Sequence, residues 1–541
     1  MSDAQRAEHL DSLGPGSSLD YRGTTFTPEL LEELLASVTG SGPREITRAS
    51  FTKAVFTDYA DFSGVTFTGV ADFTAAEFPE GARFTGATFG SAHFEGAVFG
   101  SDVQFDGGVS FTSVSFGGAR FGGGAFFDSA DFGSTKELFP NVTFAYGAHF
   151  TKVEFKSRTH MGPLVCVRGV DLTHSVFRES ATIEAAADHL ELRHTQWDST
   201  AALRLRYATV DLSNARFEYP ITITFHSEPF SITHQGGRLN LDLRAAAVDL
   251  PTPGDDLPED PLHGHDRAVQ VTSLRGVDAA HLTLTNIDLT KCVFSGTIHL
   301  DQLRMEGRCP MAPAPSGISW RRGLPVRWTR RHTLAEEHHW RRSQHTAGEW
   351  VQASDDVQVI HPPETAALYR QLRKSFEDGK NEPDAADFYY GEMEMRRKDT
   401  GRPKGERVLL TGYWAVSGYG LRVSRALGWL LLAVVLTVAL MMLWGVPQDV
   451  PQQETTGKLT GREITLTTDT PGPTDPDGKF LERISAERFE KALGIVTSAV
   501  VFRVPRQELT TSGTYIDMSF RVVAPVLLGL GALAVRGRVK R

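Results

Sequence analysis

Histidine and glutamate gather in one stretch of this 541-residue chain, and their side chains are of the types that can bind a metal ion. His332, Glu336, His338 and His339 lie within eight residues. A zinc hydrolase carries two histidines four residues apart with a glutamate directly after the first, as in HExxH, and this stretch does not have that spacing. We therefore expect neither a metal ion nor any other cofactor here.

The sequence contains no set of residues typical of an enzyme. Its three cysteines, Cys166, Cys292 and Cys309, form no CxxC pair, so a disulfide framework is not expected. It has no phosphate-binding GxxxxGK[ST] motif and no recognisable nucleophile–base set. We predict that the protein is not an enzyme.

Basic and aromatic residues alternate around the histidines, a pattern that can lie on anionic lipid or on nucleic acid. The whole chain has a formal net charge of −10, which argues against a dedicated nucleic-acid binder. We therefore favour a solvated helix face or a basic and aromatic linker over residues 306–363. The pattern consists of Trp320-Arg321-Arg322, Arg327-Trp328, Arg330-Arg331 and Trp340-Arg341-Arg342.

Phenylalanine forms the strongest pattern in the chain. Of 33 phenylalanines, 21 lie between Phe51 and Phe155, where they recur every five or six residues with a single step of seven. A small apolar residue stands two positions before nearly every one, and the residue between is mostly polar. This alternation is typical of short β-strands, and the glycine- and serine-rich turns that follow them predict a solenoid. The predicted core residues are Phe51, Phe56, Phe62, Phe67, Phe73, Phe78, Phe84, Phe89, Phe94, Phe99, Ala60, Ala71, Ala82 and Ala87.

Blocks such as Ala60-Asp61-Phe62 and Ala71-Asp72-Phe73 resemble the A-(D/N)-L/F-x-x motif of the pentapeptide-repeat family. The resemblance implies a mainly β fold, a right-handed quadrilateral β-helix with four pentads per coil. This sequence departs from the motif, because spacings of five and six alternate from Phe51 to Phe89. We expect the extra residues to bulge at the corners of the coil. A hexapeptide β-helix is the alternative, but it would keep a steady spacing of six.

The repeat continues with aliphatic residues and is predicted to span 45–305. Residues 251–265, rich in proline and aspartate, predict a loop extruded from the solenoid. Residues 1–44 are expected to contain a disordered start, without a signal peptide, and a helix at Pro28 that caps the first coil. Residues 364–400 predict an α-helical hairpin, which resembles the segment that joins solenoid and membrane part in pentapeptide-repeat membrane proteins.

The C-terminal region, 408–541, is predicted to be a membrane region. Residues 426–446 form an uncharged run long enough to cross a bilayer, and a second span is expected at about 516–535. Between them we expect an outside loop at 447–490 and a short apolar helix at 492–502. Lysine and arginine flank both spans, so the positive-inside rule places both termini in the cytoplasm, with the plasma membrane as the location. The residues expected at the membrane interface are Arg422, Arg425, Trp429, Trp444, Arg536 and Arg538.

Two spans around a short apolar helix resemble the two-helix pore module of potassium-type channels. A selective pore needs a filter of backbone carbonyls from a TVGYG-like loop, and Arg503-Val504-Pro505-Arg506 is not one. We interpret the segment as a degenerate variant of that module.

The leading hypothesis for function is a non-enzymatic, membrane-tethered scaffold whose rigid β-helix meets a cytoplasmic protein partner. The lipid bilayer is a second expected partner, and a homo-oligomer is left open. One alternative is an ion channel or channel-like sensor. The other follows from the resemblance, because some soluble pentapeptide-repeat proteins mimic DNA and bind DNA gyrase.

Overall fold

The computed structural model divides the chain into two compact units, Met1–Gly391 and Glu392–Arg541. The first contains a parallel-strand β-solenoid of about 11 turns, and the second contains two helices long and apolar enough to span a membrane. The structure describes residues 3–14, 17–39, 44–232, 254–315, 318–321, 324–327, 330–345, 349–354, 357–448, 454–460, 463–469, 473–477, 479–480, 483–500 and 509–539.

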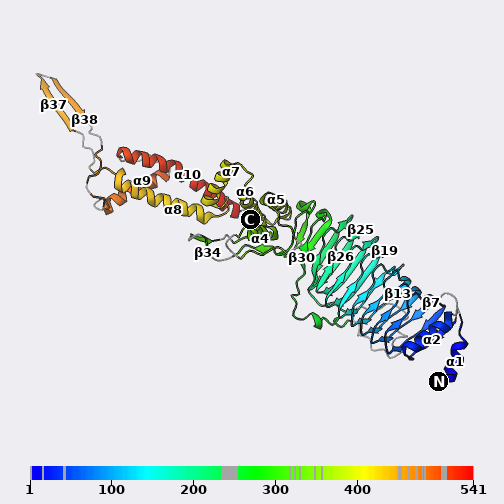
Figure 1. Cartoon of the computed structure of the whole chain (residues 1–541). Coiled ribbons are helices and arrows are strands. Elements are labelled where there is room, and N and C mark those ends of the chain that lie inside the picture. Colours follow the sequence, from blue (N-terminus) through cyan, green and yellow to red (C-terminus); the bar gives the residue numbers. More distant parts are fainter. Residues whose placement is uncertain are drawn as a thin grey trace. The chain divides into compact units, whose positions relative to one another are not determined.

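Strands of successive coils pair in parallel and build four sheets that run along the solenoid (Figure 1). The first sheet contains β1 (Ser18–Asp20), β4 (Arg48–Ser50), β7 (Thr66–Asp72), β10 (Thr88–His93) and β13 (Ser110–Ser115), with β3 (Glu45–Ile46) also paired to β7. The longest contains β2 (Thr25–Phe26), β5 (Val55–Phe56), β8 (Glu77–Phe78), β11 (Val98–Phe99), β14 (Arg120–Phe121), β17 (Val142–Phe144), β20 (Thr159–Cys166), β23 (Ala181–Ala187), β26 (Ala201–Arg206), β29 (Ile221–Phe225), β31 (Leu282–Thr285) and β32 (Arg304–Glu306), with β16 (Glu137–Leu138) also paired to β20. The third contains β6 (Ala60–Asp61), β9 (Ala82–Arg83), β12 (Val103–Gln104), β15 (Ala125–Phe126), β18 (Gly147–His149), β21 (Gly169–Asp171), β24 (His189–Glu191), β27 (Thr209–Asp211) and β30 (Gln270–Ser273). The fourth contains β19 (Glu154–Phe155), β22 (Val176–Phe177), β25 (Gln196–Trp197) and β28 (Arg216–Phe217).

Stacked phenylalanine rings fill the first half of the solenoid. In the column that runs from Phe56 to Phe144, neighbouring ring centroids are 4.7 to 5.0 Å apart. This spacing is close to the distance between hydrogen-bonded strands, because each ring extends from a strand directly paired with the next. Every phenylalanine and alanine of the predicted core is at most 1 % exposed. The rings therefore form one continuous apolar core.

The six-residue spacing from Phe67 to Phe73 is accommodated by a β-bulge. The pairing of β7 with β10 shifts register between Phe89 and Ser91, where β7 carries one residue more than its partner. Gly69 lies at this bulge, and a Cβ there would be 2.3 Å from the carbonyl oxygen of Thr47. At this position the extra residue bulges within a strand, whereas the sequence analysis expected a corner.

The aspartate of the repeat motif closes the turn that follows it. Asp72 Oδ1 accepts a hydrogen bond from Thr74 N at 3.0 Å, and Asp171 Oδ1 accepts one from Thr173 N at 2.9 Å. This local bond stabilises a turn directly after a strand. It explains why the polar residue between two core residues is often aspartate.

The N-terminal end of the solenoid is covered by helices α1 (Asp3–Asp11) and α2 (Pro28–Thr39). Helix α2 begins at the proline identified in the sequence and buries Leu31, Leu34, Leu35 and Val38. The expected disordered start differs from what the structure describes, because β1 and β2 precede α2 and already pair with strands of the next coil.

The loop expected to be extruded at 251–265 instead packs back onto the solenoid. Leu257 and Leu262, the latter at the end of the 3-10 helix η1 (Asp260–Leu262), join a buried cluster with Tyr207 and Phe230. Apolar side chains in the loop thus anchor it, and residues 251–253 lie outside the described part of the chain.

The solenoid is followed by short strands and three helices of the first unit. The elements are η2 (Ala279–His281), η3 (Leu300–Gln302), β33 (Ala312–Pro313) paired with β36 (His332–Thr333), β34 (Ile318–Arg321) paired with β35 (Leu324–Arg327), α4 (Ala335–Ser343), α5 (Pro362–Asp378) and α6 (Glu382–Lys398). Helix α6 continues into the second unit. Together α5 and α6 form a helical hairpin in the region where the sequence pattern predicts one.

The second unit consists of helices and one β-hairpin. Its elements are α7 (Lys404–Ser417), α8 (Val423–Leu440), the π-helical turn η4 (Met441–Gly445), β37 (Glu454–Thr460), β38 (Glu463–Asp469), α9 (Ala486–Val500) and α10 (Thr511–Val539). By length and composition, the helical segments Val423–Gly445 and Thr511–Val535 could each cross a membrane. Helix α9 covers most of the predicted short apolar helix, whose last two residues lie outside the described part. The β-hairpin was not predicted.

The residues expected at a membrane interface lie near the ends of these helices. Trp429 and Trp444 are 45 % and 38 % exposed. Trp429 Nε1 donates a hydrogen bond to Ala415 O, and Arg425 donates one to Trp414 O, so both side chains tie α8 to α7. The main chain at 536 and 538 continues α10, and the side chains of Arg536 and Arg538 are outside the described part.

Candidate functional site

The last strand of the longest sheet leaves one edge of the solenoid open. On one side of β32, Glu306 O accepts a hydrogen bond from Asn286 N. On the other side, Leu303 O accepts a hydrogen bond from Ser375 Oγ of α5 at 2.6 Å. Main-chain groups of successive strand residues point to alternate sides, so those of Met305 face the same way as those of Leu303. The structure thus presents an edge strand beside a helix.

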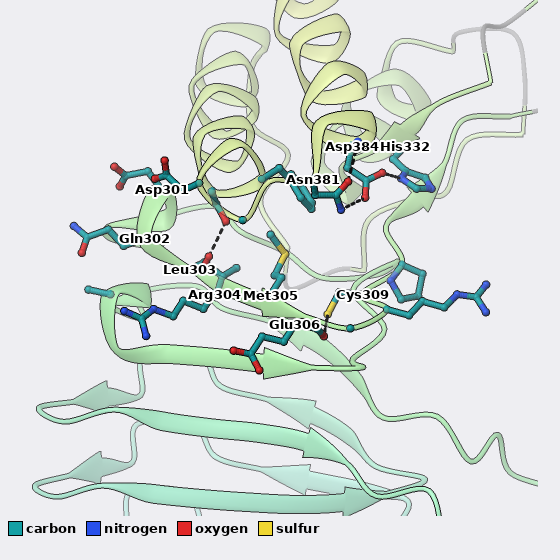
Figure 2. A pocket seen from close by; sticks show the side chains of 18 residues that line it. Asp301, Gln302, Leu303, Arg304, Met305, Glu306, Cys309, His332, Asn381 and Asp384 are labelled. Carbon is teal, nitrogen blue, oxygen red and sulfur yellow. Dashed lines mark hydrogen bonds and ion pairs between the residues drawn. The ribbon is translucent and has the colours of Figure 1, made fainter. Parts of the chain in front are cut away.

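A cavity of about 900 Å³ lies at this edge (Figure 2). Residues 301–310 form its floor, and the turn between α5 and α6 forms the opposite wall. Figure 2 shows Asn381 at this turn and Met305 between the turn and the floor. A cavity of this size is large enough for a small molecule or a short stretch of peptide.

Two ion pairs lie at this cavity, which we call the terminal cavity. His332 Nδ1 lies 2.7 Å from Asp384 Oδ1, and Lys374 Nζ lies 2.7 Å from Asp301 Oδ2 at the rim. The hydrogen bond that His332 donates to Asp384 raises the pKa of His332, and the same bond lowers the pKa of Asp384. Each of these two carboxylates therefore already has a basic partner.

Cys309 also lines the terminal cavity, which raises the question of a cysteine–histidine nucleophile. Its Sγ donates to the carbonyl oxygens of Glu306 and Leu284, at 3.5 and 3.7 Å. Burial raises the pKa of the thiol, so it is protonated at neutral pH, and the thiolate is the reactive form. In the described part of the chain no hydrogen bond joins Cys309 to His332. Cys309 thus has the surroundings of a packing residue.

The four residues considered as metal ligands are not brought together. His332 lies at the terminal cavity, whereas the other three lie on α4. His338 Nε2 is 2.8 Å from Thr333 Oγ1, and its Nδ1 accepts a hydrogen bond from Val351 N. The described residues contain no group of three or more histidine, cysteine, aspartate or glutamate side chains able to hold a metal ion.

The stretch expected to be a solvated linker instead contains a buried charge cluster. Arg331 Nη2 and Arg341 Nε each lie 2.6 Å from Glu337 Oε1, and Tyr369 of α5 donates a hydrogen bond to Glu337 Oε2. Burial would raise the pKa of Glu337, but the two guanidinium groups lower it to about 2. The linker prediction is wrong here, because every charge in the cluster has a partner. The four-residue spacing of Glu337 and Arg341 was the available sequence signal.

Glu336, on the same helix, covers the end of the solenoid core. Its Oε1 accepts a hydrogen bond from the main-chain N of Phe294 at 2.5 Å. Its other oxygen is buried without a hydrogen-bond partner in the described part of the chain. Burial raises the pKa of this carboxyl to about 7. Helix α4 therefore provides a hydrogen-bond acceptor for one main-chain N–H of the last coils, and the carboxyl group that does so is poorly solvated.

Parallel pairing, four sheets and stacked rings define this part of the chain as a β-solenoid. A family model described as pentapeptide repeats matches residues 51–98 as nine copies. Residues 51–98 therefore carry pentapeptide repeats, and the same coil architecture continues to residue 306. No curated protein and no solved structure matches the chain.

Proposed function

We propose that this protein is a non-enzymatic scaffold that is tethered to a membrane and presents its solenoid to a protein partner. The observation that supports this proposal is the solenoid itself. Its core is continuous, so its outer faces form an extended surface on a rigid support. Solenoids of this kind offer long binding surfaces because each coil contacts only its neighbours.

Helices α8 and α10 supply the proposed membrane tether. Leu431 and Val435 of α8 are 66 % and 58 % exposed, and Val522 of α10 is 69 % exposed. Apolar side chains exposed on helices of this length would be stabilised by lipid. The lysine and arginine residues that flank the two helices favour cytoplasmic termini and the plasma membrane.

The acidic charge of residues 51–140, the first part of the solenoid, favours a basic partner. Residues 51–140 contain eleven aspartate and glutamate residues against four lysine and arginine residues. Such a surface would attract a basic protein surface, most strongly at low salt. An acidic rod is also what a DNA mimic would need, so inhibition of gyrase supercoiling by the full chain would favour that alternative.

The tether is tested by washing membranes that contain the full chain with alkaline carbonate. The wild-type protein should stay in the membrane, and replacing both Leu431 and Val435 by lysine should release it, because a lysine at a helix centre costs about 3 kcal/mol. Leu466→Lys serves as the control, since Leu466 is 64 % exposed on the β-hairpin outside these helices. Release of the wild-type protein would contradict a membrane span.

The scaffold role is tested by placing a photo-cross-linker at exposed Asp58 in intact cells. A discrete adduct with a partner protein is expected, and it should weaken when neighbouring Asp61 is replaced by lysine. If no adduct forms, or if charge reversal leaves it unchanged, the acidic face is not the binding surface.

A channel remains the second candidate, and one packing feature favours it. Helices α8, α9 and α10 share one buried cluster that includes Val438, Ile495 and Phe520. At Gly513 of α10 a Cβ would lie 2.5 Å from Gly445 O, so the helix is held against the end of the first span. Ion conductance across a planar bilayer containing the purified full chain would support a pore, and its absence would leave the scaffold.

A further inference from the structure

A second cavity, of about 400 Å³, lies beside the last coils of the solenoid, and we call it the lateral cavity. It is formed where the pairing of β27 with β30 shifts register between Val210 and Asp211. Such a bulge re-aims the side chains around it and is common beside binding sites. Helix α4, together with Val351, Gln352, Ser354 and Val357, completes the wall.

Two cationic side chains line this lateral cavity. Arg275 and Lys291 are both exposed, and neither makes an ion pair with another described residue. Thr290 Oγ1 accepts a hydrogen bond from Gln270 Nε2 at 3.2 Å, so its own hydroxyl hydrogen is available to another acceptor. The lining of the cavity therefore includes several donors.

The single carboxylate among the lining residues is already neutralised. Asp211 Oδ1 accepts hydrogen bonds from the main-chain N and the hydroxyl of Ser213, at 2.8 and 2.6 Å. Its Oδ2 lies 3.0 Å from Arg193 Nε. An incoming anion would thus meet unpaired cations and no unpaired carboxylate of the cavity.

A buried imidazole provides an independent sign of a missing ligand. His339 lines the cavity and is only 9 % exposed, and its Nδ1 has no hydrogen-bond partner among the described residues. Burial lowers the pKa of His339, so the ring is neutral at neutral pH. A buried polar atom without a partner is destabilising, and a ligand that hydrogen-bonds to it removes that cost.

The lining also includes the aliphatic side chains of Ala312, Ala335, Val351 and Val357, beside polar residues such as Gln352 and Ser354. The volume exceeds what a bare phosphate ion would fill and lies within the range of small-molecule sites. Hydrogen-bond donors and aliphatic groups in one lining match a ligand with an anionic head and an apolar body.

We propose that the lateral cavity binds a phosphate monoester with an apolar body. Arg275 and Lys291 pair with the phosphate oxygens, Thr290 donates to them, and His339 hydrogen-bonds to the ligand. The same headgroup occurs in soluble phosphate esters and in phosphatidic acid, and the chemistry of the site is common to both.

The test is calorimetric titration of the detergent-solubilised full chain with phenyl phosphate. We expect saturable one-to-one binding, weaker binding of inorganic phosphate, and no binding of the uncharged benzyl alcohol. Arg275→Ala and Lys291→Ala should each weaken binding of phenyl phosphate by roughly tenfold or more, because each removes a charge-assisted contact. Arg216→Ala is the matched control, an exposed arginine on β28 that does not line the cavity.

Two further arms separate the sources of the ligand and the role of the imidazole. Competition by vesicles of phosphatidic acid would assign the headgroup to lipid, and its absence would assign it to a soluble ester. His339→Leu keeps a buried side chain of similar size and should weaken binding while leaving the thermal midpoint of the free protein unchanged or higher. Absence of binding at millimolar phenyl phosphate, or equal weakening by Arg216→Ala, would overturn the proposal.

Discussion

At the scale of single residues, each position of the repeat has a distinct physical role. The phenylalanine ring stacks on the ring one coil away, whereas the small residue two positions earlier leaves room for rings from the other columns. Phe62 lies 5.2 Å from Phe84 in its own column and 5.4 Å edge-to-face from Phe73 in another. Both geometries are favourable for aromatic pairs. A ring in mid-column therefore contributes through several neighbours at once.

Phe84→Ala tests this core directly. Phe84 is fully buried and stacks on Phe62 and Phe105, at 5.2 and 4.8 Å, so truncation should destabilise the solenoid by about 3–5 kcal/mol. The measurement is the urea midpoint followed by far-ultraviolet circular dichroism. Thr88→Ala, at an exposed position of β10, is the control and should leave the midpoint nearly unchanged.

Glu336 predicts a pH dependence of stability. Folding raises the pKa of this carboxyl from 4.5 to about 7. Its favourable contribution to the free energy of unfolding is therefore complete below about pH 4.5 and is lost as the pH rises through 7. The loss amounts to about 3 kcal/mol at high pH. Thermal midpoints measured from pH 5 to 8.5 should fall more steeply for the wild type than for Glu336→Gln. Exposed Glu364→Gln should follow the wild type, and parallel curves for Glu336→Gln would contradict the prediction.

At the scale of elements, the solenoid is stabilised by segments that cover its edges and faces. Helix α2 covers the first coil with apolar side chains, and α4 covers the last coils with Glu336. The returning loop covers one side through Leu257, Leu262 and an ion pair. An uncovered strand edge would be open to pairing with another chain, so these covers also limit association.

Substitution of two arginines on strand β26 tests how much the ion pair with the loop contributes to stability. Arg206 is 1 % exposed and lies 2.8 Å from Glu259 of the loop, whereas Arg204 is 56 % exposed and lies 2.8 Å from Glu184. Arg206→Met leaves a buried carboxylate unpaired and should cost about 3–5 kcal/mol. Arg204→Met should cost about 1 kcal/mol or less. Equal midpoints in urea unfolding would show that the loop does not depend on the buried pair.

At the scale of the whole molecule, the chain combines a β-solenoid unit with a helical unit. The core of the solenoid is formed entirely within Met1–Gly391. Apolar side chains in mid-helix positions of α8 and α10 are exposed within their own unit. The solenoid unit therefore buries its own apolar core, whereas the helical unit has apolar side chains that lipid or detergent would cover.

Deleting residues 408–541 should remove the apolar helices and leave the solenoid folded. The truncated chain is expected to be soluble without detergent and to show a β-rich circular dichroism spectrum, because the solenoid core is left intact. A helix-dominated spectrum, or a chain that still needs detergent, would contradict this division of the molecule.

Short-range patterns in the sequence determined the repeat, because the solenoid is built from contacts at a fixed separation of about one coil. The alternation around Phe51 and its successors predicts the strands, the core and the coiling. The run from 426 to 446 identifies an apolar helix for the same reason, since length and composition alone define it.

Only the tertiary structure decided where polar residues of distant segments meet. Arg331, Glu337 and Tyr369 form one buried cluster although 38 residues separate the first from the last, and no local pattern reports that partnership. The two cavities arise in the same way, where a segment beyond the solenoid folds back over its last coils. Burial changes the chemistry of these groups, as the opposite pKa shifts of neighbouring Glu336 and Glu337 show. Their surroundings, rather than their residue type, determine what they do.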